Sequence, residues 1–151
     1  ITNVRENTDS KVKIYEGSKA VGHVYDEIFS SGEVKSYVNI PQIEELMPEN
    51  FEKYINPIND KKLIMWDLFE DCENARKFVK KSLLAIKPEL RKNYHFKFLP
   101  TGLKIQAIDY LIYYDSIAII QGEKVTSAIV IKNKYLFENS IMMYDLMWRL
   151  L

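Results

Sequence analysis

The chain has few of the residues from which disulfide frameworks and metal centres are built. It contains one cysteine, Cys72, and two histidines. A single thiol forms neither an internal disulfide nor a thiolate metal site, and this usage fits a cytosolic protein. His23 is the lone histidine of its predicted helix, so a metal site there is not expected. We expect no metal and no cofactor.

The chain also lacks an excess of one charge and a long hydrophobic run. Lys and Arg together number 21, and so do Asp and Glu. A domain that binds DNA alone usually carries a basic excess, because neutralised phosphates supply most of the affinity. No apolar run approaches the roughly 18 residues that a membrane span needs, and no signal peptide is visible. We therefore expect a cytoplasmic protein that neither binds DNA by itself nor enters a membrane.

What is present indicates a single globular domain. The 151 residues, 47% of them hydrophobic, suffice for one substantial core, and the ten tyrosines mostly indicate strands and a filled interior. Residues 1–10 are polar and turn-prone, so we expect the end of a linker there and the domain at 11–151. Because the sequence begins with Ile1 and not Met, we expect it to be part of a longer protein.

Hydrophobic periodicity predicts alternating strands and helices in the first half of the chain. The expected strands are 11–15, 33–40 and 61–68, and the expected helices are 18–31, 42–57 with a break at Pro48, and one starting near Asp71. This β-α-β-α-β-α order is typical of a largely parallel sheet covered by helices.

The second half predicts a different arrangement. Strand candidates at 94–99, 107–113, 117–121 and 125–132 have short connections, which favours an antiparallel or mixed meander. The last 17 or so residues predict a helix with two apolar stripes, of which the first is Phe137, Ile141, Tyr144, Trp148 and Leu151 and the second is Met143, Met147 and Leu150. Such a helix must be buried in the core or against a partner. The expected fold class is therefore α/β with a mixed sheet and a C-terminal helix.

Polar and aromatic residues follow two of the predicted strands. Trp66 and Asp67 stand near the predicted carboxyl end of the third strand, and Asn39 ends the second. Ligands of open α/β sheets collect beyond such strand ends. These three side chains would suit a small polar metabolite, although a core Trp followed by a helix-capping Asp explains the pair equally well.

One stretch, residues 111–122 with the sequence LIYYDSIAIIQG, predicts a strand buried on both faces at 117–120. It resembles the core strand of the phospholipase D-like fold, whose catalytic signature is His-x-Lys-x4-Asp. In that family the His attacks phosphorus, the Lys stabilises phosphate oxygens and the Asp orients the His. With the apolar runs aligned, the three positions hold Tyr114, Ser116 and Gln121. We therefore expect a ligand-binding frame without catalytic residues.

A second string, His95-Phe96-Lys97, begins like the same signature. Gly102 stands where the signature requires Asp, and the turn at 100–102 breaks the strand that the motif needs. A catalytic role for His95 is therefore not expected. An exposed or locally hydrogen-bonded histidine on a strand is the better interpretation.

Six short stretches, in a fixed order along the chain, carry a second resemblance: 14–17, 31–34, 91–100, 112–120, 128–134 and 144–148. Through them the whole chain resembles the effector domain of TrmB-type transcriptional regulators, which are mainly archaeal and join an N-terminal winged helix to a C-terminal phospholipase D-like sensor. The resemblance implies a ligand-sensing homodimer that contacts DNA only through a domain absent from this chain. The family's sugar sensors continue past this point with a β-rich segment that helps to bind the sugar, so the resemblance leaves open whether the metabolite is a sugar.

Three functions remain open from the sequence. The first is a non-catalytic sensor and dimerisation domain of a transcription regulator. The second is a divergent phosphodiesterase or nuclease that uses Tyr114 or His95. The third is a protein-interaction module, which differs from the sensor in needing no polar pocket at the strand ends.

Overall fold

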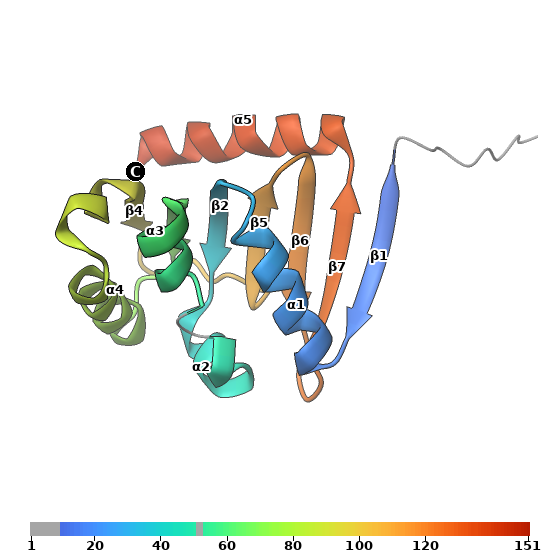
Figure 1. Cartoon of the computed structure of the whole chain (residues 1–151), viewed down its shortest axis with the longest axis horizontal. Helices are drawn as coiled ribbons and strands as arrows, with labels where there is room; N and C mark the ends of the chain where they lie inside the picture. The colour runs from blue at the N-terminus through green and yellow to red at the C-terminus, as the bar shows by residue number, and fades with distance from the viewer. Residues whose placement is uncertain (1–9, 51–52) are drawn as a thin grey trace, which may run out of the picture.

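The computed structural model describes residues 10–50 and 53–151 (Figure 1). The predicted linker at 1–10 lies outside these residues except for Ser10, whose hydroxyl accepts a hydrogen bond from the Asn133 side chain. The strands are β1 (Lys11–Glu16), β2 (Glu33–Val38), β3 (Ile64–Phe69), β4 (Tyr94–Phe98), β5 (Asp109–Tyr113), β6 (Ser116–Gln121) and β7 (Ser127–Lys132). The helices are α1 (Ser18–Ile28), α2 (Ile40–Leu46), α3 (Ile55–Lys61), α4 (Glu73–Ala85) and α5 (Lys134–Leu150).

The described strands form one mixed sheet in the order β1-β7-β6-β5-β2-β3-β4. Strands β2, β3 and β4 are parallel to one another, and the remaining neighbours are antiparallel. The mixed sheet, the β5-β6-β7 meander and the C-terminal helix confirm the predicted fold class. Two pairings differ from the prediction: β1 joins β7 at one edge and not the parallel half, and β4 pairs with β3 and not with the meander. Strand partners lie far apart in sequence, so local periodicity does not specify them.

The alternation of side chains along the strands gives the sheet two different faces. Helices α1 to α4 cover one face, where the main core contains residues such as Val34, Met65 and Leu111. The other face carries a smaller cluster around Leu68 and Ile112 beneath α5. Helix α5 runs crosswise to the strands at one end of the sheet (Figure 1).

The position of β3 corrects one sequence-based placement. Helix α3 continues through Pro57 to Lys61, because proline in the first turn of a helix costs no helical hydrogen bond. Lys62 then turns the chain with a φ of 56°, and the strand begins only at Ile64. Trp66 and Asp67 therefore lie in the middle of β3, on opposite faces, and not at its carboxyl end.

The first predicted stripe of α5 packs against the sheet. Tyr144 is fully buried, and Phe137, Ile141 and Trp148 are packed against the same cluster. Asn133 begins the helix, and its side chain accepts a hydrogen bond from the N–H of Leu136 at 2.8 Å. The second stripe faces outward, so only part of the apolar circumference is covered.

Candidate functional site

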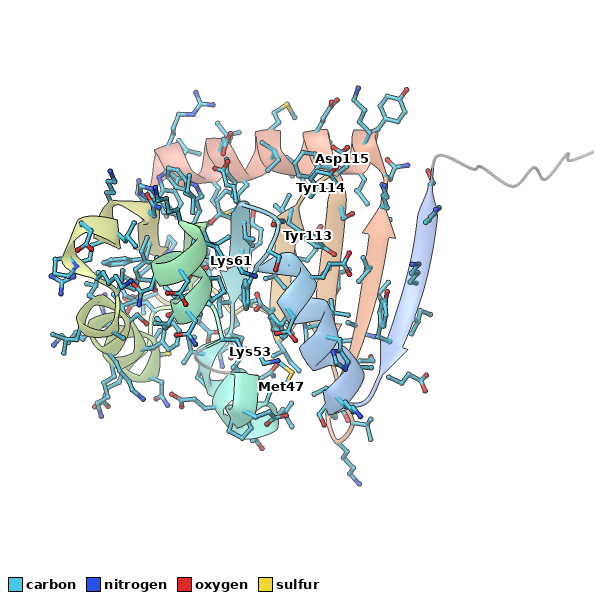
Figure 2. The ribbon with its side chains drawn as sticks, in the orientation of Figure 1. Met47, Lys53, Lys61, Tyr113, Tyr114 and Asp115 are labelled. Atoms are coloured by element: carbon cyan, nitrogen blue, oxygen red, sulfur yellow. The ribbon has the colours of Figure 1, made fainter. Side chains whose placement is uncertain are left out.

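The turn between β5 and β6 occupies the place that the resemblance gives to the nucleophile. Tyr114 and Asp115 form this turn with φ angles of 32° and 56°, and Tyr113 pairs with Ser116 across it. Two positive φ angles are the type I′ geometry of tight hairpins, but they are uncommon for tyrosine. The Asp115 carbonyl accepts a 3.0 Å hydrogen bond from the N–H of Asn133. The turn is thus held beside the N-terminal half of α5 (Figure 2).

Tyr114 borders a pocket between this turn, β2 and α5, which we call the α5 pocket. Its volume is about 410 Å³. Its walls combine charged with apolar side chains: Glu33, Lys35 and Glu138 among the former, and Ile112, Tyr114, Phe137 and Ile141 among the latter. A pocket of this size and mixture suits a small molecule with polar and apolar parts.

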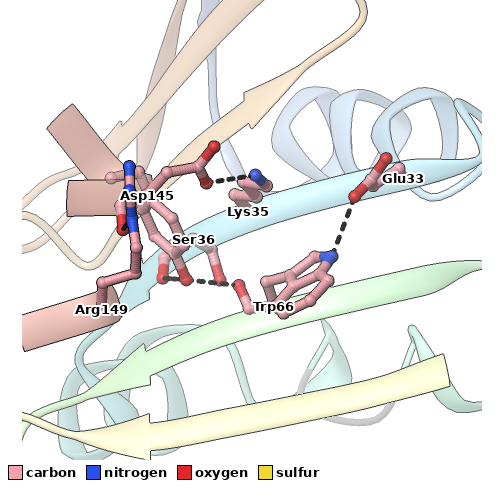
Figure 3. A network of polar contacts seen from close by, with 7 residues as sticks. Glu33, Lys35, Ser36, Trp66, Asp145 and Arg149 are labelled. Carbon is pink, nitrogen blue, oxygen red and sulfur yellow. Dashed lines mark hydrogen bonds and ion pairs between the residues drawn. The ribbon is translucent and has the colours of Figure 1, made fainter. Parts of the chain in front are cut away.

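A polar network beside this pocket joins α5 to β2 and β3 (Figure 3). The Lys35 ammonium lies 2.5 Å from an Asp145 carboxylate oxygen and 5.6 Å from the centroid of the Trp66 ring. The Trp66 indole N–H donates to Glu33 at 2.9 Å. The Tyr144 hydroxyl donates to the backbone oxygen of Trp66 at 2.8 Å. Lys35 therefore belongs both to the pocket wall and to the attachment of α5, whereas Glu33 acts on α5 only through the Trp66 ring, which packs against Trp148.

The His-x-Lys string of β4 contributes to the same attachment. The His95 ring stacks on Trp66 with centroids 3.8 Å apart, and burial lowers the pKa of His95, although Glu33 acts in the opposite direction. The Lys97 ammonium donates to the Trp148 carbonyl at 2.7 Å. His95 is thus a half-buried stacking residue, and these contacts give it a structural role in packing.

Ser116 lies on the other side of the sheet from the α5 pocket. It is buried at the floor of a hollow of about 200 Å³ beside β1 and α1. Lys11, Lys13 and Lys132 border this hollow. Tyr114 and Ser116, the positions of His and Lys in the signature, therefore face two different spaces.

Asn39 and Gln121 lie at the opposite end of the sheet from the turn, as the strand register requires. Asn39 is buried and caps α2: its side-chain oxygen accepts from the N–H of Gln42 at 3.3 Å, and its amide donates to the Ile105 carbonyl at 3.0 Å. Gln121 is exposed at the end of β6. Neither residue borders the α5 pocket.

Asp67 points into the main core and not toward α5. It accepts a 2.5 Å hydrogen bond from the Ser36 hydroxyl, and burial raises its pKa to about 7 against that bond. Asp109 faces the same cavity of about 30 Å³ and accepts a 2.9 Å bond from the Tyr25 hydroxyl. Burial holds the pKa of Asp109 well above its usual range. A cavity of this volume has room for about one water, so Asp67 does not share a metabolite-sized site with Tyr114.

The six predicted ligand-binding residues are thus dispersed. Tyr114 alone borders the α5 pocket, and Trp66 reaches it through Glu33. Sequence reasoning missed Glu33, Lys35 and Glu138. A signal for the first two was available, because alternate residues of the predicted strand 33–40 must share a face.

Two further features concern residues 10–50 and 53–151. No group of three or more His, Cys, Asp or Glu side chains is placed to hold a metal ion within this part of the chain. No helix in it is long and apolar enough to cross a membrane.

Comparison with solved structures finds the same fold in proteins of very low sequence identity. TrmBL2, described as an archaeal chromatin protein with a novel mode of DNA binding, has a TM-score of 0.62 at 12% identity, over 95% of this chain and 54% of its own. Nuc from Salmonella typhimurium, a phospholipase D family member, has a TM-score of 0.63 at 12% sequence identity, and the match covers 93% of this chain and 95% of Nuc. NucT from Helicobacter pylori has a TM-score of 0.63 at 10% sequence identity, and the match covers 93% of this chain and 96% of NucT. The fold is phospholipase D-like.

In this phospholipase D-like domain, β6 is the third of seven strands and so lies inside the sheet, as the resemblance requires. The chain spans about half the length of TrmBL2. No family model and no curated protein sequence matches it. Identities of 10–12% establish the fold alone, and the loss of the catalytic residues at Tyr114, Ser116 and Gln121 stays a prediction.

Proposed function

We propose that this domain is the ligand-sensing and dimerisation module of a cytoplasmic, TrmB-like transcription regulator and that it has no catalytic activity. The observation that carries the proposal is the α5 pocket, which is bounded by the sheet on one side and by α5 on the other. DNA would be bound by a winged-helix domain of the parent protein. The likeness to TrmBL2 supports this class of protein.

The surroundings of Tyr114 support the proposed absence of catalysis. A nucleophile needs a base within hydrogen-bonding reach, and Tyr114 has no hydrogen-bond partner among the described residues. Of the acids in the α5 pocket, Glu33 accepts from Trp66 and Glu138 lies 3.9 Å from Lys134. Ser116, at the signature's Lys position, faces another hollow and carries no positive charge.

Sensing would act through Lys35 and Glu33. A metabolite that bonds to Lys35 competes with the Asp145 contact that holds α5, and one that bonds to Glu33 releases the Trp66 ring that packs against Trp148 of α5. Ligand binding would therefore shift the position or stability of α5, as required of a ligand that favours one of two conformations. A metabolite with a hydroxyl or amino group and an apolar part fits the walls best.

Dimerisation would use the outward side of α5. Four large apolar side chains there are more than half exposed: Met142, Met143, Leu146 and Leu150. Contiguous apolar surface of this kind marks an interaction site more often than an idle face. A second copy of this domain is the partner that the family resemblance implies.

The test is a thermal-shift survey of small polar metabolites, followed by the variant Tyr114→Asn. Asparagine tolerates the positive φ of the turn, so the variant removes the aromatic wall of the α5 pocket without disturbing the hairpin. We expect at least one metabolite to raise the melting temperature of the wild type and to lose this effect in the variant. Tyr135→Asn, on the exposed side of α5, is the matched control. A survey without any stabilising metabolite, together with a monomer in solution, would refute the proposal.

A divergent phosphodiesterase is the second candidate, favoured by the fold shared with Nuc. Its prediction is turnover of bis-p-nitrophenyl phosphate or DNA that Tyr114→Phe or His95→Gln abolishes. The sensor proposal predicts no turnover in any of these proteins. A stable dimer that binds no metabolite would instead favour the interaction module.

A further inference from the structure

Three lysines gather on the sheet edge next to α1, in the hollow that Ser116 borders. Lys11 lies directly opposite Lys132 in the β1–β7 register, and Lys13 follows on the same face of β1. Like charges directly opposite one another on neighbouring strands destabilise a sheet. The arrangement therefore needs an explanation other than the stability of this edge. We call this space the lysine hollow.

The described protein does not neutralise these charges by ion pairing. Within residues 10–50 and 53–151, the ion pairs found involve none of Lys11, Lys13 and Lys132. The single carboxylate that borders the hollow is that of Glu27, on α1. Three ammonium groups thus face one carboxylate, and the hollow keeps a net positive charge.

Hydroxyl groups form the floor of the hollow. The register aligns Lys11, Lys132, Ser116 and Tyr113 in one row across β1, β7, β6 and β5. Ser116 and Tyr113 are both buried, and neither hydroxyl has a hydrogen-bond partner among the described residues. Burial raises the pKa of Tyr113, with Glu27 and Tyr15 acting in the same direction. The phenol therefore stays protonated and able to donate.

We propose that the lysine hollow binds the phosphate group of a small phosphorylated metabolite. Ammonium groups and hydroxyl donors converging on one point are what a compact dianion requires. The hollow's volume of about 200 Å³ accommodates a phosphate and part of the group that bears it. Glu27 provides an acceptor for a hydroxyl beside the phosphate. Ser116 thus contributes a donor where lysines of neighbouring strands supply the charge.

A small phosphate ester fits better than a nucleic acid. An extended polyanion needs a basic stripe and usually a basic excess, whereas this chain carries equal numbers of acidic and basic residues. The lysine hollow and the α5 pocket lie on opposite faces of the sheet. Evidence against the sensor proposal would therefore not exclude the phosphate site, and evidence against the phosphate site would not exclude the sensor.

The test is calorimetric titration with inorganic phosphate and glucose 6-phosphate, with glucose and a short DNA duplex as comparisons at matched ionic strength. In the double variant Lys11→Gln/Lys132→Gln we expect phosphate affinity to fall by about tenfold or more, because charge-assisted hydrogen bonds are lost. Lys80→Gln/Lys124→Gln removes the same charge from two exposed lysines elsewhere and should bind like the wild type.

Folding is checked in the same proteins. Relief of the Lys11–Lys132 repulsion predicts a melting temperature for the first double variant that equals or exceeds that of the wild type. Nuclear magnetic resonance should place the phosphate-induced shifts at Tyr113 and Ser116. The proposal is overturned by wild-type protein that binds neither phosphate nor glucose 6-phosphate, by equal losses in the two double variants, or by binding of the DNA duplex alone.

Discussion

Two carboxyl groups, those of Asp67 and Asp109, lie in the core with hydroxyl partners and with no basic partner in the part of the chain that the structure describes. One Asp109 oxygen is buried without a hydrogen-bond partner among the described residues. Burial disfavours the charged form of a carboxyl group, which accounts for the raised pKa of both. Their protonation state consequently links the stability of the fold to pH.

Asp67→Asn should flatten the dependence of stability on pH. The pKa of Asp67 in the folded state, about 7, exceeds the unfolded value of about 3.9, so the folded state binds more protons. Its contribution is present below pH ~4 and is lost as pH rises toward ~7, a change on the order of a few kcal/mol. Urea unfolding at pH 5 and pH 8 measures it.

The exposed Asp60→Asn serves as the control for this experiment and should keep the wild-type slope. Asp109 keeps part of the dependence in the same direction, because its pKa is also raised. An Asp67→Asn protein whose unfolding free energy changes with pH as steeply as the wild type would contradict the assignment.

Tyr144→Phe should lower the free energy of unfolding by about 1–2 kcal/mol, the usual cost of losing a buried hydrogen-bond donor. Its hydroxyl donates to the carbonyls of Ser36 and Trp66, whereas the ring packing stays in place. Tyr135→Phe, on the exposed side of α5, should leave stability unchanged. Equal stability of both variants and the wild type would mean that the hydroxyl contributes nothing to holding α5.

For single residues, the sequence identified chemically distinctive side chains but not the roles that they have in the structure. The aromatic and acidic character of Trp66 and Asp67 suggested a ligand, yet Trp66 packs between His95 and Trp148 and Asp67 lies in the core. Their opposite faces follow from the alternation of a strand alone, but their distance from the strand's ends depends on where it begins and stops. That start was displaced by Pro57, which continues α3 instead of ending it.

Among the elements, α5 has the clearest division between an inner and an outer side. Its inner side holds Tyr144, Trp148 and the Lys35–Asp145 ion pair against the sheet. Its outer side leaves apolar residues exposed. The 3.6-residue period revealed both stripes in the sequence, but periodicity alone does not state which stripe faces the sheet.

Leu146→Glu combined with Leu150→Glu should abolish dimerisation and leave a folded monomer, whose melting temperature no longer depends on protein concentration. Both side chains are more than half exposed on α5. The new carboxylates would therefore be buried, at a cost in free energy, only in the dimer interface. Light scattering after size-exclusion chromatography measures the mass. Leu84→Glu, at a position of α4 that is also more than half exposed, should remain dimeric, and a double variant that also stays dimeric would exclude this side of α5 as the interface.

Strand positions were largely predictable, because apolar alternation is a local property, but strand partners were not. The apolar residues of β1 also contradict a simple reading of alternation. Val12 and Ile14 are about two-thirds exposed, while Lys11 and Lys13, which alternate with them along β1, line the lysine hollow. Since β1 is an edge strand, neither of its faces is fully covered, and its pattern does not indicate which side is inward.

At the scale of the whole molecule, one end of the sheet concentrates the candidate functional features. The strained β5–β6 turn, the α5 pocket and the lysine hollow all meet there. The sequence predicted this end through the phospholipase D-like strand, although the charged residues around it come from β1, β2, β7 and α5. Such convergence arises from topology, which a linear motif does not contain.

The dimer dissociation constant, measured by sedimentation equilibrium with and without the metabolite that stabilises the domain most, tests the sensor proposal most directly. In the proposal the ligand binds at Lys35, whose ion pair with Asp145 holds α5, and α5 provides the dimer surface. We therefore predict that the ligand changes the dissociation constant of the wild type by about fivefold or more and leaves that of Tyr114→Asn unchanged. An identical dissociation constant for wild-type protein with and without saturating ligand would contradict the account.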